Sequence, residues 1–217
     1  MDAEFWHERW QKQDIGFHRT HVHPQLATHF DTLSEAARQR VFVPLCGKSL
    51  DMLWLCQQGA AVVGCELSPL AIAAFAQEQG LTLTQTAHGE HTRHAQSGLS
   101  VWQGDYFTLA PEQINCTGFY DRAALVALPP AMRETYVAQL EHLVATNACG
   151  LLITFSYDSQ RMSGPPFALT HAEVRALFQA HWQIDLLSCE DVISEHAGIQ
   201  ARGLDRFEES VWRLTRR

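Results

Sequence analysis

Residues 41–68 constrain the fold of this 217-residue chain most, because they combine two apolar runs with a glycine turn and a carboxylate. The first run, 41–45, leads into a turn at Gly47, and the second run, 61–65, ends on Glu66. Between the two runs lies a segment with a helical pattern. This order predicts strand, turn, helix and strand, with an acidic side chain at the tip of the second strand.

Glu66 follows Gly47 by 19 residues, a spacing typical of β-α-β units whose acidic residue binds the ribose of a nucleoside. A dinucleotide would need the pattern G-x-G-x-x-G, and this turn has only Gly47 before the helix. A phosphate-binding P-loop would need a glycine where the chain has Phe42. The pattern favours a nucleoside cofactor without phosphates, commonly S-adenosylmethionine. An ordinary β-α-β unit, in which Glu66 merely precedes a helix, stays open.

The composition predicts one globular domain over 1–217 that binds neither nucleic acid nor membranes. A hydrophobic content of 46% with 18% charged residues excludes a disordered chain. Lys and Arg total 16 against 24 Asp and Glu, and the net charge of −8 without a basic run excludes nucleic acid as partner. The charged first ten residues and the lack of long apolar stretches indicate a soluble, cytoplasmic protein, which we expect to be a monomer.

Cysteine and histidine patterns give no metal or disulfide framework. The six cysteines lie in or beside apolar runs without a C-x-x-C pair, which is typical of core residues in a reducing compartment. His88, His91 and His94 recur every three residues, which is one way to build a metal site. Their segment is polar and contains a glycine, so we expect a solvated loop and no metal.

Further apolar runs and capping signals predict the remaining elements. Strands are expected at 99–103, 118–120, 150–157, 182–187 and 207–214, and helices at 2–13, 25–35, 49–58, 69–80, 130–144 and 170–181. The polar segments 81–98 and 194–206 are expected as loops. The first helix carries Phe5, Trp6 and Trp10 on one face. It is either a helix docked on the core or a lid over a ligand.

Strand-helix alternation followed by a terminal strand pair predicts an α/β fold. Its sheet is seven-stranded and mostly parallel, with one antiparallel strand and helices on both faces. Ligands bind such sheets beyond the carboxyl ends of the strands. Residues 45–47, Glu66, Asp105 and 121–122 each follow a predicted strand. These four segments should therefore converge on one crevice.

The chain resembles the thiopurine S-methyltransferase family. The resemblance rests on VPLCGKSLDMLWL (43–55), VVGCELS (62–68), GDYF (104–107), YDRAALVALP (120–129) and GPPF (164–167), and with FWHERWQ and GFH near the start it spans nearly the whole chain. It implies the class I methyltransferase (Rossmann-like) fold with an N-terminal helical lid. It also implies S-adenosylmethionine as methyl donor, S-adenosylhomocysteine as product, and aromatic or heterocyclic thiols as acceptors. The cofactor contacts that it implies are Trp10, Leu45, Glu66 and Arg122.

The predicted roles of the cofactor residues follow from their chemistry. Leu45 can act only through its backbone carbonyl, as acceptor for the methionine ammonium group. Gly47 belongs to the turn that approaches the nucleoside, and Trp10 either covers the methionine portion or anchors the core. Asp105 and Tyr106 follow the strand where the adenine edge would lie, although a carboxylate at this place is often only a helix cap.

Arg122 is the predicted residue for orienting the acceptor or the cofactor carboxylate, because its planar fork suits planar anions. The alternative is an ion pair with Asp121 or another carboxylate. A heterocyclic thiol is acidic enough to need no general base, and Asp14 is the one candidate for that role. Phe17 with 165–166 resembles the wall of the family's substrate pocket.

Two other functions stay open at this point, a nicotinamide-dependent oxidoreductase and a non-catalytic nucleoside-binding protein. The absent second and third glycines count against the first, and turnover of a thiol would exclude the second. Because a methyl donor reacts with soft nucleophiles, the acceptors could include selenium or tellurium species. A detoxifying role with tellurite resistance is then expected.

Overall fold

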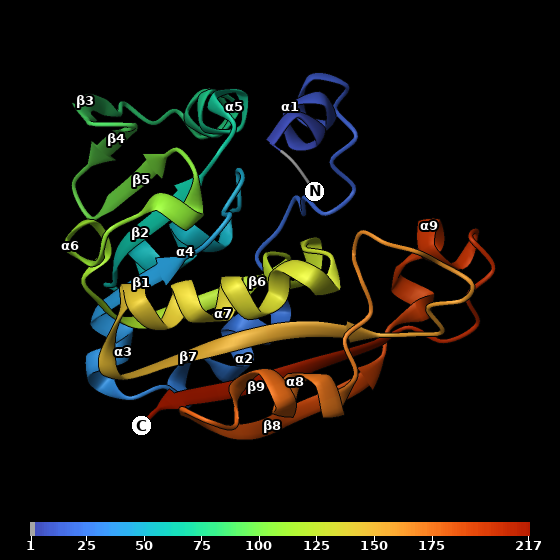
Figure 1. The fold of residues 1–217 in the computed structure, drawn as a ribbon. Coiled ribbons are helices and arrows are strands. Elements are labelled where there is room, and N and C mark those ends of the chain that lie inside the picture. The colour runs from blue at the N-terminus through green and yellow to red at the C-terminus, as the bar shows by residue number, and fades with distance from the viewer. Residues whose placement is uncertain (1–2) are drawn as a thin grey trace.

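The computed structural model describes residues 3–217, and its elements alternate as predicted (Figure 1). The helices are α1 (Ala3–Gln11), α2 (Pro24–His29), α3 (Glu35–Gln39), α4 (Asp51–Gln57), α5 (Pro69–Gln79), α6 (Pro111–Ile114), α7 (Pro130–Leu143), α8 (His171–Phe178) and α9 (Ala197–Gln200). The strands are β1 (Arg40–Val43), β2 (Ala61–Glu66), β3 (Thr84–His88), β4 (His91–Gln96), β5 (Leu99–Gln103), β6 (Cys116–Arg122), β7 (Val144–Ser156), β8 (Trp182–Asp191) and β9 (Glu208–Arg216). Short 3-10 turns lie at η1 (Phe30–Thr32), η2 (Tyr106–Thr108), η3 (Leu125–Ala127) and η4 (Ile193–Glu195).

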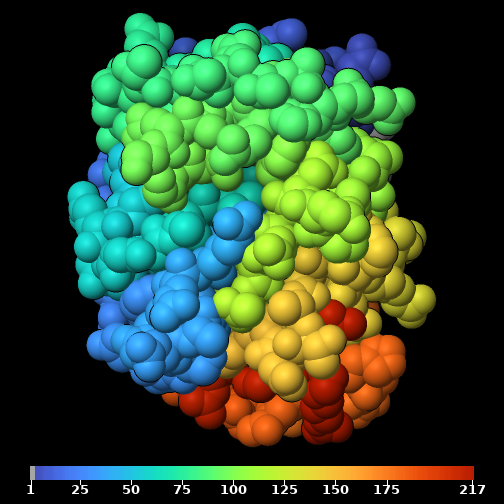
Figure 2. All heavy atoms as spheres, turned by 90° about the vertical axis from the view of Figure 1, so that its left-hand side faces the viewer, coloured from blue at the N-terminus to red at the C-terminus, as the bar shows by residue number. Residues whose placement is uncertain are grey.

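Within residues 3–217, nine strands form one sheet in the order β3-β4-β5-β2-β1-β6-β7-β9-β8. Strands β5, β2, β1, β6 and β7 are parallel neighbours, and β9 runs antiparallel between β7 and β8. This part is the predicted seven-stranded sheet with one antiparallel strand. Figure 2 shows the two ends of this order, with the green segment that contains β3–β5 at the top and the orange and red segments that contain β8 and β9 at the bottom.

The two additional strands correct the expectation of a loop at 81–98. Strands β3 and β4 form an antiparallel hairpin, and β4 pairs with β5 at the edge of the sheet. The side chains of β3 are exposed throughout, so the strand lacks the apolar alternation by which sequence patterns are recognised. The prediction that His91 and His94 are solvated is wrong, because both side chains are buried. His91 bonds to the carbonyl of Asp105, and His94 bonds to the side chain of Gln103.

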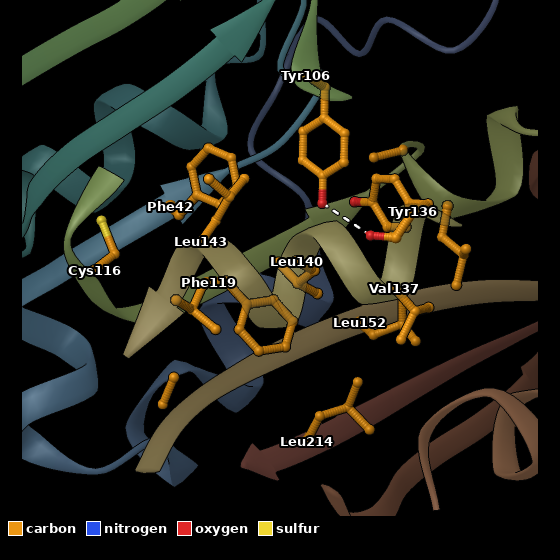
Figure 3. Close-up of a cluster of buried hydrophobic side chains, with 14 of the residues drawn as sticks. Phe42, Tyr106, Cys116, Phe119, Tyr136, Val137, Leu140, Leu143, Leu152 and Leu214 are labelled. Carbon is orange, nitrogen blue, oxygen red and sulfur yellow. Dashed lines mark hydrogen bonds between the residues drawn. The ribbon is translucent and has the colours of Figure 1, made fainter. Parts of the chain in front are cut away.

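The parallel strands are covered on both faces, and their side chains alternate between two cores. On β1, Phe42 belongs to one cluster, and Val41 and Val43 belong to the other. The first cluster packs against α7 and α8 in front of the sheet in Figure 1, and part of it is shown in Figure 3. The second receives side chains from α2, α3, α4 and α5, including Leu26 and Phe75. Burial on both faces explains the apolar runs of these strands.

Several predicted boundaries shift in the structure. The helix expected at 25–35 is divided into α2 and η1, and α3 follows as a separate helix with Ser34 as its N-cap. The first helix ends at Gln11, and its predicted start at residue 2 lies outside the described residues. The expected loop at 194–206 contains α9. Four of the six cysteines are buried as predicted, whereas Cys189 on the edge strand β8 is exposed.

Candidate functional site

A cavity of about 740 Å³ lies at the carboxyl ends of the parallel strands. The segments that follow β1, β2, β5 and β6 contribute 45–49, 66–67, 104–107 and 122–123 to its wall. Helix α1, the loop after it and the segment around α9 close it from the outside. Every site residue predicted from the sequence lines this cavity, so the expected convergence of four strand ends is found in the structure.

The carboxylate of Glu66 is buried at the tip of β2 and bonded to two backbone N–H groups. The N–H of Gly47 donates to Oε2 at 2.8 Å, and the N–H of Ser68 donates to Oε1 at 2.6 Å. The 19-residue spacing thus corresponds to direct contact between the turn and the acidic residue. A carboxylate has about four acceptor positions, so these bonds leave capacity for the hydroxyl groups of a ribose.

Burial raises the pKa of Glu66 to about 7, although the backbone N–H groups of Ser68, Gly47 and Leu67 act in the opposite direction. The side chain is only 6% exposed, and the loss of hydration disfavours its charged form. Hydrogen-bond donors from a ligand would favour the ionised carboxylate. A ligand that donates hydrogen bonds to Glu66 would therefore increase the ionised fraction of its carboxyl group.

The turn after β1 has two residues with left-handed backbone conformation. Leu45 has φ +45° and Gly47 has φ +54°. The left-handed conformation is energetically unfavourable for a leucine, and backbone strain of this kind is commonly found at binding sites. A Cβ atom on Gly47 would lie 3.2 Å from Cζ2 of Trp10, so the indole of α1 packs directly on the turn. The buried Trp10 is therefore both a core contact and part of the cavity wall.

Asp105 and Tyr106 lie after β5 but differ in what their side chains contact. Asp105 is exposed and caps η2, because its Oδ1 accepts from the N–H of Phe107 at 2.9 Å. The ring of Tyr106 is buried in the core and stacks on Tyr136, and its hydroxyl donates to the carbonyl of Tyr136 at 3.1 Å (Figure 3). Asp105 therefore has the helix-capping role that the sequence indicated as an alternative. The ring of Tyr106 is part of the core and is held there by its contacts with Tyr136.

Arg122 ends β6, lines the cavity, and connects the loop after α1 to the start of α4. Its Nε donates to Oδ2 of Asp51 at 3.1 Å, and its Nη1 donates to the carbonyl of Phe17 at 3.1 Å. The predicted alternative, an ion pair with Asp121 or another carboxylate, is present with Asp51. Asp121 points into the core, where it accepts from the hydroxyl of Tyr136 at 2.7 Å. The bonds to Asp51 and Phe17 use two of the five N–H donors of the guanidinium, and the others can donate to a ligand.

The loop after α1 and the proline loop provide the other predicted residues. Asp14 is exposed and pairs with Arg9 at 3.0 Å. The ring of Phe17 meets Trp10 edge to face, with the ring centroids 5.8 Å apart. Pro165 and Pro166 line the cavity beside η3 and β7. Phe17, Pro165 and Pro166 make their part of the wall apolar.

Sequence reasoning missed three buried polar residues, Asp51, His23 and Glu209. Asp51 accepts from the backbone N–H of His23 at 2.8 Å and from the hydroxyl of Tyr120 at 3.1 Å. His23 in turn lies 3.2 Å from Glu209 through its Nε2. In the sequence, Asp51 lies near the start of the helix predicted at 49–58, and Glu209 is one of two adjacent glutamates near the start of the strand predicted at 207–214. Neither position carries a signal of burial.

The fold and the position of the cavity define the class of protein. The structure resembles a SAM-dependent methyltransferase from Anabaena variabilis with a TM-score of 0.64 and 15% identity, over 99% of this chain and 95% of that chain. It also resembles 1,6-didemethyltoxoflavin-N1-methyltransferase from Burkholderia thailandensis, solved with bound S-adenosylhomocysteine, with a TM-score of 0.63, 15% identity, and 99% and 86% of the two chains covered. At these identities the likeness shows the fold. It is that of the class I S-adenosylmethionine-dependent methyltransferases.

The chain belongs to the thiopurine S-methyltransferase family, whose sequence model matches residues 1–217. It is 45% identical over 218 residues to a thiopurine S-methyltransferase from Azotobacter vinelandii and 44% identical over 218 residues to one from Pseudomonas fluorescens, with 100% of each chain covered in both cases. It is an enzyme that transfers methyl groups to sulfur with S-adenosylmethionine as cofactor. This decides against the oxidoreductase and the non-catalytic protein.

The residues of the inner cavity fit that cofactor. A buried carboxylate with spare acceptor capacity at the end of β2 matches a ribose, whereas it would repel the phosphates of a dinucleotide. The left-handed Leu45 and the tight turn at Gly47 bring backbone groups to the cavity. The donor and acceptor set is therefore that expected around a nucleoside without phosphates that has a polar amino-acid tail.

Proposed function

We propose that the enzyme methylates the sulfur of aromatic and heterocyclic thiols, including thiopurines. The observation that carries this proposal is the flat apolar wall of the cavity near the end of β7 and the start of β9. Phe155 and Phe207 stack with ring centroids 4.7 Å apart and an interplanar angle of 19°, and Phe17, Pro165 and Pro166 line the same cavity. Such faces favour a planar, apolar acceptor.

For the cofactor, we propose that Glu66 accepts hydrogen bonds from the ribose hydroxyls and that the carbonyl of Leu45 accepts from the methionine ammonium group. Gly47 would allow close approach of the backbone, and Trp10 would cover the methionine portion. The positions of these groups around the inner cavity support the assignment. Bound S-adenosylmethionine supplies an electrophilic methyl group on a sulfonium.

At the adenine end of the cavity, we propose that Asp105 and Tyr106 contribute through the backbone that follows β5. The carboxylate of Asp105 is occupied as a cap, and the ring of Tyr106 lies in the core. Their place in the cavity wall supports a contact of main-chain atoms with the base.

For the acceptor, we propose that Arg122 holds the thiol sulfur or an adjacent ring nitrogen, with the donors left free by Asp51 and Phe17. Displacement at a sulfonium methyl needs an aligned nucleophile and little covalent help, so orientation in a pocket without bulk water is the main task of the protein. Asp14 is paired with Arg9 and 63% exposed, which disfavours it as a general base.

The test is calorimetric titration with S-adenosylhomocysteine, with NADH as control, followed by turnover assays with a thiopurine and with thiophenol against phenol. We expect binding of the nucleoside, no binding of NADH, and methylation of the thiols with no methylation of phenol. Binding without methylation of either thiol would refute the acceptor class.

We further propose that the enzyme is a cytoplasmic monomer that detoxifies reactive thiols. No helix among residues 3–217 has the length and apolar character needed to cross a membrane, and the net charge of −8 supports the absence of nucleic acid as partner. Selenium and tellurium nucleophiles are softer than thiols and suit the same displacement, which would link the enzyme to tellurite resistance. Volatile methylated products above purified enzyme supplied with hydrogen selenide would support this range of acceptors, and sedimentation would give the oligomeric state.

A further inference from the structure

His23 is a buried imidazole in the cavity wall that the proposed roles leave unused. It lies immediately before α2 and is 2% exposed. Its backbone N–H donates to Oδ1 of Asp51 at 2.8 Å, and its ring Nε2 lies 3.2 Å from Oε2 of Glu209 on β9. Glu209 is also buried, at 5% exposure. Main chain and ring are therefore both held in place.

The partner on Nε2 determines which ring nitrogen of His23 can accept a proton. An ionised carboxylate only accepts hydrogen bonds, so in the neutral imidazole the hydrogen is assigned to Nε2 and points to Glu209. The lone pair is then on Nδ1. Within the described part of the chain, Nδ1 is buried and has no hydrogen-bond partner. A buried imidazole nitrogen with an unused lone pair in a cavity wall is a candidate proton acceptor.

Charged side chains from several elements surround His23. Asp51 and Glu209 supply two carboxylates, and Arg122 supplies one fixed positive charge, paired to Asp51 at 3.1 Å. The other polar groups nearby are Tyr120 from β6, Arg19 from the preceding loop, and Glu195 and His196 from the segment before α9.

We infer that His23, oriented by Glu209, takes the proton of acceptor thiols that are not already ionised when they bind. In this step the S–H bond breaks and its electron pair stays on sulfur, while the proton moves to Nδ1 along a path that acceptor binding must open, because less than 1 Å² of this nitrogen is exposed in the structure. The thiolate is then the nucleophile, and His23 returns the proton to solvent after the reaction. The inference rests on the proposed function and extends it to thiols of ordinary acidity, which Arg122 alone would not activate.

The same geometry would also serve as a purely structural link that fixes the loop before α2 to β9. His23→Gln separates the two readings, because a glutamine amide can still donate to Glu209 but has no basic nitrogen. Glu209→Gln is the matched variant, since it keeps an acceptor for Nε2 and removes the negative charge. Thermal unfolding of both variants reports on any loss of the link.

The kinetic experiment compares two acceptors, 4-nitrothiophenol, which is ionised at neutral pH, and benzyl mercaptan, which is protonated. For His23→Gln we expect kcat/KM to fall about 100-fold more for benzyl mercaptan than for 4-nitrothiophenol, as for loss of a general base. Raising the pH should narrow this gap, because it ionises benzyl mercaptan in solution. Glu209→Gln should show the same selectivity to a smaller degree. Equal losses for both acceptors would overturn the role of His23.

A second measurement needs no turnover. The ultraviolet absorbance of thiophenol distinguishes thiol from thiolate, and its titration in complex with enzyme and S-adenosylhomocysteine gives the pH at which the bound sulfur ionises. We expect ionisation at a lower pH with the wild-type enzyme than with His23→Gln, and an unchanged midpoint would overturn the inference. If the wild-type enzyme methylates neither thiol, the proposed function fails and the role of His23 with it. If the wild-type enzyme methylates the thiols but His23→Gln lowers kcat/KM equally for both, the proposed function stands and only the role of His23 is refuted.

Discussion

Arg122 and Asp51 form an ion pair of 3.1 Å that joins the carboxyl end of β6 to the amino end of α4. Asp51 is 2% exposed and also accepts from the backbone of His23 and the hydroxyl of Tyr120. Arg122 reaches outward to the carbonyl of Phe17. One buried carboxylate thus positions both the guanidinium in the cavity and the loop that closes it.

Asp51→Ala should lower the free energy of unfolding by about 3–5 kcal/mol, the usual effect of removing one partner from a buried ion pair. The substitution leaves the guanidinium of Arg122 and the hydroxyl of Tyr120 without their acceptor. In Asp51→Ala/Arg122→Ala the loss should be smaller than the sum of the single losses, because no unpaired guanidinium remains. Urea denaturation of the four proteins measures this coupling, and additive losses would contradict it.

Arg122→Ala should reduce kcat/KM for a thiopurine by about 10- to 100-fold, the effect of losing one charged hydrogen bond of about 1.5–3 kcal/mol. Arg122→Lys should recover little, because an ammonium cannot bond to Asp51, Phe17 and a ligand in the geometry of the planar fork. Steady-state kinetics below the melting temperature of each variant give the comparison. Wild-type kinetics in Arg122→Ala would remove this residue from the site.

Glu66→Ala should weaken the affinity for S-adenosylhomocysteine by at least about tenfold, or 1.4 kcal/mol. The physical reason is the loss of a buried acceptor for the ribose hydroxyls, together with the unpaired N–H groups of Gly47 and Ser68. Isothermal titration calorimetry gives the dissociation constant directly. An affinity equal to that of the wild-type protein would exclude Glu66 from the ribose site.

The pH dependence of cofactor affinity should follow the ionisation of Glu66, whose pKa burial raises to about 7. If the ionised form binds the ribose, affinity for S-adenosylhomocysteine rises with pH and levels off above this value, and at one pH unit below it is about tenfold weaker. Glu66→Gln should remove this dependence. A pH-independent wild-type affinity between pH 6 and 8 would be the contrary result.

The same pKa makes the unliganded protein less stable as pH rises. Between the ordinary carboxyl pKa of 4.5 and about 7, the folded state holds a proton on Glu66 that the unfolded state has lost. The free energy of unfolding should therefore fall over this range by about 1.4 kcal/mol per unit of pKa difference. Asp121, whose pKa burial raises to about 6, acts in the same direction. Denaturation of Glu66→Gln should show a shallower fall than the wild-type protein.

Gly47→Ala should destabilise the protein and weaken cofactor binding, because its φ is +54° and the new methyl group would press on Trp10. Gly59→Ala is the matched control. Gly59 has φ +89° and no atom within 4 Å of an added Cβ, so it carries the backbone cost of about 1–2 kcal/mol without a new contact. Both variants should melt earlier, and only Gly47→Ala should lose affinity in calorimetry. Equal affinities would show that the turn tolerates a side chain.

The parallel core was predictable because its strands are covered on both faces and read as continuous apolar runs. Segments 61–66 and 99–103 agree closely with their predicted ranges. The hairpin at 84–96 was not predictable, since its strands are polar and one is exposed throughout. Its strands exist because β5 offers an edge with unpaired backbone groups, and an edge is a property of the assembled sheet.

The sequence by itself determined the α/β class and the crevice at the strand ends. It also determined that Gly47 and Glu66 stand at the turn and the strand tip of one β-α-β unit, because strand periodicity, turn chemistry and a fixed spacing are local properties of the chain. Only the tertiary structure decided which carboxylate pairs with Arg122, and that Asp51, His23 and Glu209 are buried together. These residues lie up to 186 positions apart, and they meet because α2 and α4 pack on one face of the sheet that contains β9. Burial, charge balance and proton affinity arise from that packing, and no local pattern encodes them.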